Sequence, residues 1–178
     1  CGGLAGVSAS QVEINSGIQF YDGITTEEIQ QILIKSASDL ITLDNPNYQY
    51  VAARLLLYGL RKAVFGKDGW EKAHPSLHDH AKACVDKRLY DWVIHERDHY
   101  FTYAGLRQVV DKYLVQDRST GKVFESPQFM YMMIAVTLFV EYPKDKRLSY
   151  IKRYYDSISK HKINIPTPIM AGVRTPLR

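Results

Sequence analysis

The sequence has little cysteine and no long apolar run, and both shortages limit where the protein could work. Its two cysteines, Cys1 and Cys84, are too few for the disulfide framework of a small secreted protein, so we expect reduced thiols. No stretch of about 20 apolar residues could span a bilayer. The first residues also lack the basic segment and apolar stretch of a secretory signal. We therefore expect a cytoplasmic protein without membrane contact.

Clustered charge of one sign is also lacking. The formal net charge is +4, but the 23 lysines and arginines are scattered among 19 aspartates and glutamates. Proteins that bind nucleic acid usually gather their basic residues in a patch or stripe. We expect no nucleic-acid partner, although a small basic nucleic-acid-binding protein stays open as an alternative.

A phosphate-binding loop and a metal-binding pattern are both missing. Cys1-Gly2-Gly3 has no strand before it and no Lys-Ser or Lys-Thr after it, as nucleotide-binding loops require. Possible metal ligands gather in one segment: His74, His78, Asp79, His80 and Cys84. Zinc needs a second ligand pair from elsewhere, and the remaining histidines offer no matching spacing. We predict a solvated polar helix there, and no metal site.

What the sequence does contain is a series of amphipathic helices. Its 178 residues, 46% of them hydrophobic, suffice for one globular core. Ser10 with Glu13 fits a capping box, which predicts a helix over about 11–20. Thr25 with Glu28 repeats the box before a second helix with an apolar face at three- and four-residue spacings. A third helix over about 47–65 should end at Gly66, a left-handed terminator.

The second half of the chain changes its pattern twice. A helix over about 101–114 precedes residues 114–125, where a turn at 117–121 predicts a small hairpin. Pro127 then opens a helix to about 140 that is apolar nearly all round and so must be buried. A further helix is predicted over about 145–160, and the isoleucines beyond it alternate through prolines as an extended, strand-like tail.

Three separated blocks and the strings between them give the sequence a specific character. The blocks are Ile18-Gln-Phe-Tyr-Asp-Gly-Ile24, Pro46-Asn-Tyr-Gln-Tyr-Val-Ala-Ala-Arg54 and Ile165-Pro-Thr-Pro-Ile-Met-Ala-Gly-Val-Arg-Thr-Pro176. The strings are Lys112-Tyr-Leu-Val-Gln-Asp-Arg118, Glu125-Ser-Pro-Gln-Phe129 and Arg153-Tyr-Tyr-Asp156. Together they resemble, in order, the N-terminal part of the large subunit of class I ribonucleotide reductases of bacterial and phage type.

The resemblance implies a mainly α fold in three parts. Residues 1–63 would be the C-terminal part of an ATP cone, which senses ATP and dATP as allosteric effectors. Residues 64–162 would form the all-α domain of the large subunit, and residues 163–178 the first strand of its ten-stranded α/β barrel. The hairpin that opens the cone in this family has no counterpart in this sequence, so we expect an incomplete effector site.

The resemblance also assigns roles to three residues. Thr167 corresponds to a threonine that binds the substrate diphosphate, and prolines on both sides should hold it extended. Thr26 and Lys62 correspond to cone residues near the effector nucleoside and its phosphates. Since Glu27 and Glu28 would repel phosphate, we expect Thr26 near the base or ribose. A lysine in the last turn of a helix is also what the helix dipole favours, so Lys62 has an alternative explanation.

The implied activity is reduction of ribonucleoside diphosphates to deoxyribonucleotides for DNA synthesis. The implied partners are a radical-generating small subunit, a second large subunit and thioredoxin or glutaredoxin. The redox and thiyl-radical cysteines of the family have no match in Cys1 or Cys84, so we expect this piece of the enzyme to be inactive alone and to hold no cofactor. A stand-alone helical nucleotide-sensing or interaction module is the other alternative.

Overall fold

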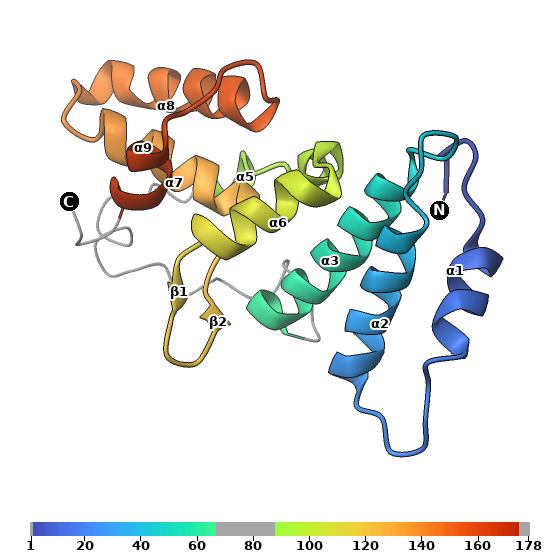
Figure 1. The fold of residues 1–178 in the computed structure, drawn as a ribbon. Helices are drawn as coiled ribbons and strands as arrows, with labels where there is room; N and C mark the ends of the chain where they lie inside the picture. Colours follow the sequence, from blue (N-terminus) through green and yellow to red (C-terminus); the bar gives the residue numbers. More distant parts are fainter. Residues whose placement is uncertain (1, 67–87, 175–178) are drawn as a thin grey trace. The chain divides into compact units, whose positions relative to one another are not determined.

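The chain folds mainly into helices, as the sequence predicts. The computed structural model describes residues 2–66 and 88–174 (Figure 1). In chain order the elements are α1 (Ala9–Gly17), α2 (Thr26–Asp39), α3 (Tyr48–Phe65), α5 (Arg88–Asp91), the 3-10 helix η1 (His95–Tyr100), α6 (Tyr103–Lys112), β1 (Gln116–Asp117), β2 (Lys122–Val123), α7 (Pro127–Phe139), α8 (Lys144–Ser159) and α9 (Thr167–Gly172).

These elements form two compact units. The first consists of Cys1–Leu60 with His99–Gln108, and the second of Arg61–Asp98 with Val109–Arg178. The three domains expected over 1–63, 64–162 and 163–178 stay a prediction.

The second helix of the first unit begins as its sequence predicts. The backbone N–H of Glu28 donates to the Thr25 hydroxyl at 3.2 Å, and the N–H of Thr25 donates to the Glu28 carboxylate at 2.9 Å. These two bonds complete the capping box before α2. The core of the unit joins α1, α2 and α3 through five buried residues: Val12, Ala37, Tyr48, Val51 and Ala52.

The first helix begins earlier than predicted. The cap of α1 is Ser8, whose hydroxyl accepts from the backbone N–H of Gln11, so the box expected from Ser10 and Glu13 is wrong. The reason lies 40 residues away, because the N–H of Ser8 donates to the Tyr48 hydroxyl at 3.0 Å. The same hydroxyl donates to the Gln11 side chain. A buried tyrosine of α3 therefore selects the serine at which α1 begins.

The third helix ends at the residue predicted from the sequence. Gly66 has φ +75°, and its N–H donates to the carbonyl of Lys62 at 3.0 Å. A left-handed residue in this place satisfies one of the last carbonyls of α3. The glycine terminator is thus confirmed.

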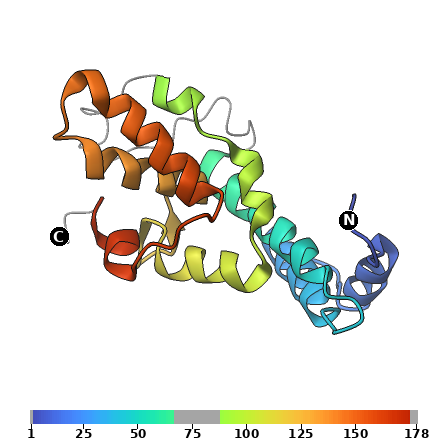
Figure 2. The ribbon, with the colours of Figure 1, turned by 90° about the horizontal axis from the view of Figure 1, so that it is seen from above.

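The second unit is built around α7. Its residues from Pro127 to Val136 are all buried, which confirms the prediction made from their apolar character. The helix contacts both α8 and α9, and α8 runs alongside it in both views (Figures 1 and 2). The buried residues of α8 are Ile151, Tyr155, Ile158 and Ser159.

The hairpin expected over residues 114–125 is present. Strands β1 and β2 pair antiparallel, with Gln116 opposite Val123 and Asp117 opposite Lys122. Gly121 closes the turn with φ +72°, and its N–H donates to the Asp117 carbonyl at 2.8 Å. The chain thereby turns back on itself between α6 and α7.

The tail differs from its prediction. We expected an extended strand from Ile163 onward, but Thr167–Gly172 forms the short helix α9. Pro166 is its cap and Pro168 lies in its first turn, where proline lacks only an N–H that a helix would leave unused. In a strand the same prolines would remove ladder hydrogen bonds, and β1 and β2 are the only strands within residues 2–66 and 88–174. The strand prediction is therefore wrong for residues 167–172.

Candidate functional site

Thr167, predicted to bind substrate, is the first residue of α9 and has an exposed side chain. Its Oγ1 lies 3.2 Å from the hydroxyl oxygen of Tyr113, at the C-terminal end of α6. Two residues 54 positions apart in the chain thus bring two hydroxyl groups together at the surface. Either hydroxyl can donate, and hydrogen bonds to ionised oxygens are about twice as strong as those between neutral groups. Since one hydroxyl donates to the other, one O–H of the pair is left to donate to a bound anion.

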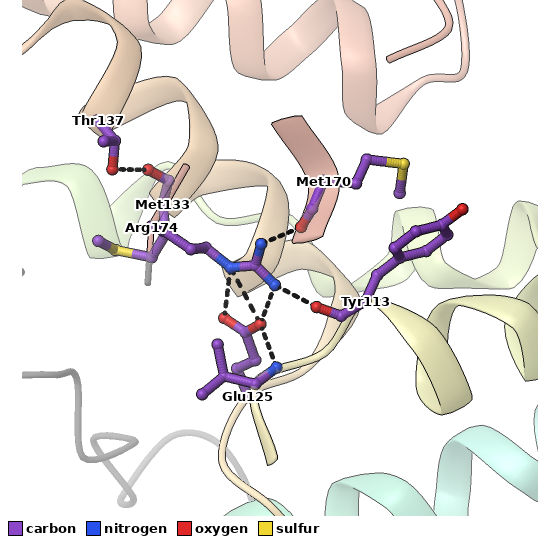
Figure 3. Close-up of polar contacts among 7 residues, drawn as sticks. Tyr113, Glu125, Met133, Thr137, Met170 and Arg174 are labelled. Carbon is purple, nitrogen blue, oxygen red and sulfur yellow. Dashed lines mark hydrogen bonds and ion pairs between the residues drawn. The ribbon is translucent and has the colours of Figure 1, made fainter. Parts of the chain in front are cut away.

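An arginine just after α9 fixes the helix to the rest of the second unit (Figure 3). The guanidinium of Arg174 forms an ion pair with Glu125, with Nε 3.1 Å from Oε1 and a closer contact through Nη2. Nη2 also donates to the carbonyl of Tyr113 at 2.6 Å, and Nη1 donates to the carbonyl of Met170. One side chain therefore joins α9, the end of α6 and the segment before α7.

The ion pair is buried, which distinguishes it from an ordinary surface pair. The side chains of Arg174 and Glu125 are 3% and 10% exposed. Glu125 also accepts from the backbone N–H of Val115 at 2.8 Å, so its carboxylate is held by the residue that precedes the hairpin. A buried charge is tolerated only with good partners, and here both charges have several.

A second polar cluster lies inside the same unit, around the carboxyl group of Asp98. Its side chain is fully buried and lies 3.1 Å from Nη2 of Arg61. Nε2 of Gln128 donates to the other carboxyl oxygen at 2.9 Å. Gln128 in turn accepts from the hydroxyl of Tyr155 at 2.9 Å, and that hydroxyl accepts from the N–H of Ile94 at 2.8 Å. The cluster ties η1 to α3, α7 and α8.

Burial changes the acidity of Asp98. Its pKa is raised to about 6, mainly because the ionised carboxylate loses hydration, while the bonds from Gln128 and Arg61 act in the opposite direction. His95, in the same 3-10 helix, has its pKa lowered to about 4 by burial and then by the charge of Arg61. The imidazole contacts Phe65 and Phe129, with ring centroids 5.9 and 5.3 Å away. His95 is therefore a neutral part of the core at pH 7.

The two residues predicted to bind an effector lie in different units. Thr26 is the first residue of α2, exposed, with its hydroxyl 3.1 Å from the carboxylate of Glu27. The capping role belongs to Thr25, so the hydroxyl of Thr26 is not needed for the cap. Lys62 is exposed in the last turn of α3, where its charge also favours the helix dipole.

Sequence reasoning missed Tyr113, which contacts Thr167, and the ion pair of Glu125 with Arg174. Tyr113, Glu125 and Arg174 all lie inside strings that we quoted for the family resemblance, but nothing in their spacing shows that they meet. Glu125 and Arg174 are 49 positions apart. The one available signal was an acidic residue two positions before a buried apolar helix, where an unpaired charge would be unfavourable.

Metal ligation finds no support within the described ranges. No group of three or more histidines, cysteines, aspartates and glutamates there could hold a metal ion. The segment His74 to Cys84, where we predicted a polar helix without metal, lies outside the described residues. No helix of residues 2–66 and 88–174 is long and apolar enough to cross a bilayer.

Comparison with known proteins confirms the resemblance. Residues 99–178 match the family described as the all-alpha domain of ribonucleotide reductase. Over 99% of its length the chain is 47% identical to the alpha subunits of ribonucleoside-diphosphate reductase 1 from Salmonella typhimurium and Escherichia coli. It is 42% identical, over 97% of its length, to the alpha subunit from Enterobacteria phage T4.

The match covers nearly all of this chain but only a part of each relative. The chain spans about a quarter of the length of these curated relatives, since the alignments cover 25% of each. Identity near one half extends over almost the whole chain, from the first helices to the tail. The chain belongs to the family of ribonucleotide reductase large subunits.

Proposed function

We propose that this chain is part of a ribonucleoside-diphosphate reductase and serves the reduction of ribonucleoside diphosphates to deoxyribonucleotides. The observation that carries the proposal is the 47% identity over 99% of the chain to subunits with that name. A radical-generating small subunit, a second large subunit and thioredoxin or glutaredoxin belong to the proposal as partners.

Within that reaction we assign substrate binding to Thr167. Its hydroxyl would donate to the diphosphate, with the Tyr113 hydroxyl 3.2 Å away as a neighbour that can donate or accept. Both groups are neutral hydroxyls, which suits binding and orientation of the substrate rather than proton transfer to the reacting centre. Exposure of Thr167 and its position at the start of α9 support this role.

The test replaces Thr167 by valine in the complete large subunit, assayed with its small subunit. Valine keeps the β-branched shape and removes the hydroxyl. A hydrogen bond to a charged group contributes about 1.5–3 kcal/mol, so we expect KM for the diphosphate to rise roughly ten- to a hundredfold. If the bond is equally strong in the ground state and the transition state, kcat changes little.

Thr137→Val is the matched control. The Thr137 hydroxyl donates within α7 to the carbonyl of Met133 at 2.8 Å (Figure 3), and among the described residues no hydrogen bond joins it to Thr167 or Arg174. The same chemical change should therefore leave KM at the parent value. An unchanged KM in Thr167→Val, or an equal rise in both variants, would return Thr167 to an ordinary residue of α9.

We also propose that Thr26 and Lys62 contribute to an allosteric site for ATP and dATP. Lys62 offers an exposed positive charge for phosphate at the end of α3. Thr26 offers a hydroxyl beside Glu27, an environment that suits a neutral base or ribose better than phosphate. We therefore propose that Lys62 binds the phosphates of the effector and that Thr26 contacts its nucleoside.

A further inference from the structure

The short helix that carries Thr167 has an unusual attachment. α9 is six residues long and has no buried residue of its own. Helices of this length are unstable in isolation, because only a few backbone bonds offset the cost of ordering the first turn. Contacts from outside must therefore keep α9 helical and in place. At the C-terminal end of α9, Arg174 supplies such a contact.

Arg174 connects α9 to Tyr113. Its Nη1 donates to the carbonyl of Met170 in the last turn of α9, and its Nη2 donates to the carbonyl of Tyr113 at 2.6 Å (Figure 3). The hydroxyl of that same Tyr113 lies 3.2 Å from Oγ1 of Thr167. The arginine thus fixes both the helix that presents Thr167 and the residue that contacts its hydroxyl.

Glu125 keeps the arginine in this position. The Arg174 side chain is only 3% exposed, and a buried guanidinium whose partners were carbonyls alone would be drawn toward water. The Glu125 carboxylate neutralises it through both Nε and Nη2. The backbone N–H of Val115, two residues after Tyr113, anchors that carboxylate at 2.8 Å.

We propose that Glu125 and Arg174 are positioning residues that hold α9 and thereby set the position of the Thr167 hydroxyl. For catalysis this inference rests on the proposed substrate role of Thr167. Neither member of the pair needs to touch the substrate. Their effect on substrate affinity should pass through Thr167, which makes it separable from a general loss of stability.

The test is Glu125→Gln in the complete large subunit, alone and combined with Thr167→Val. Glutamine keeps the size of the side chain and an oxygen that can accept from Val115, but it loses the charge that holds Arg174. We expect KM for the ribonucleoside diphosphate to rise at least about threefold, which lies within the range of coupling between residues of one hydrogen-bond network. In the Thr167→Val background the same change should raise KM less than about twofold, because the contact it supports is already gone.

The matched control is Asp156→Asn, another loss of an ion pair in the same unit. Asp156 lies 2.7 Å from Nη2 of Arg97. This variant should leave KM unchanged in both backgrounds even where it lowers the melting temperature. Equal increases of KM by Glu125→Gln with and without Thr167→Val would overturn the inference, and so would an equal rise in Asp156→Asn.

Hydrogen exchange of the complete subunit separates the two proposals. Glu125→Gln should speed amide exchange in residues 167–172, whereas Asp156→Asn should not. If Thr167→Val leaves KM unchanged, the substrate role of Thr167 is wrong, and exchange still decides whether the ion pair holds α9. Exchange in α9 that is the same in Glu125→Gln and the parent overturns the inference whatever KM does.

Discussion

Replacing Asp98 by asparagine should change how the stability of the protein depends on pH. In the folded chain the pKa of Asp98 is raised from 3.8 to about 6, chiefly by burial. Asparagine has nearly the same shape, can accept the bond from Gln128, and does not titrate. Any part of the pH profile that comes from this carboxyl group must therefore disappear in Asp98→Asn.

The sign follows from which state holds the proton. Between pH 3.8 and about 6 the folded state keeps the Asp98 proton and the unfolded state has lost it. Stability from this group is therefore complete below pH 3.8 and is lost as the pH rises through 6. The shift of about two pKa units corresponds to about 3 kcal/mol, of which about 2 kcal/mol falls between pH 4 and pH 6.

Urea unfolding of the chain and of Asp98→Asn, followed by circular dichroism from pH 4 to pH 8, measures the difference directly. The free energy of unfolding of the variant minus that of the parent should increase by about 2–3 kcal/mol over this range. His95 titrates with the opposite sign, since its lowered pKa costs stability as the pH falls from 6.5 to about 4. It is present in both proteins and cancels. A difference that is flat, or that falls with pH, would show that Arg61 outweighs burial at Asp98.

Two further predictions concern the first three helices. Lys62→Ala in the complete subunit should raise the ATP concentration needed for half-maximal activation, since one phosphate contact is lost, whereas Lys35→Ala on α2 should not; equal activation curves would remove Lys62 from the effector site. Thr25→Ala should lower the free energy of unfolding by about 0.5–2 kcal/mol through loss of the cap of α2, measured by urea unfolding. Thr26→Ala should cost less, and the reverse order would contradict the assignment of the cap.

Features that depend on neighbouring residues could be predicted from the sequence. The capping box of Thr25 and Glu28 spans four residues, and the left-handed Gly66 follows directly on its helix. The hairpin turn closed by Gly121 is equally local. In each case the chemistry of a few adjacent residues determines the local backbone conformation, so the sequence pattern is enough to predict it.

Features that depend on distant partners could not be predicted. Ser8 caps α1 because Tyr48 binds it from 40 positions away. The strand prediction for the tail was wrong for a different reason. Pro166 and Pro168 fit an extended segment and a first helical turn equally well. Only the contacts of the folded unit, among them the bond from Arg174 to the Met170 carbonyl, favour the helix.

The residues of the candidate site likewise fall into those that the sequence could predict and those that only the fold brings together. Thr167 could be named because its string resembles the family, which needs no knowledge of the fold. Its neighbour Tyr113 and the pair of Glu125 with Arg174 could not, because they meet only after α6, the hairpin and α9 have folded. The buried carboxyl of Asp98 was missed as well, since its partner Gln128 lies 30 positions further along.

The most direct test of the reductase assignment is a chimaera of the Escherichia coli alpha subunit in which this chain replaces the homologous quarter. The chimaeric subunit, purified and mixed with the Escherichia coli small subunit and a reductant, is assayed for deoxyribonucleotide formed from a ribonucleoside diphosphate. We predict formation well above the blank, and a higher KM when the chimaera carries Thr167→Val. A folded chimaera that associates with the small subunit but forms no deoxyribonucleotide would contradict the account.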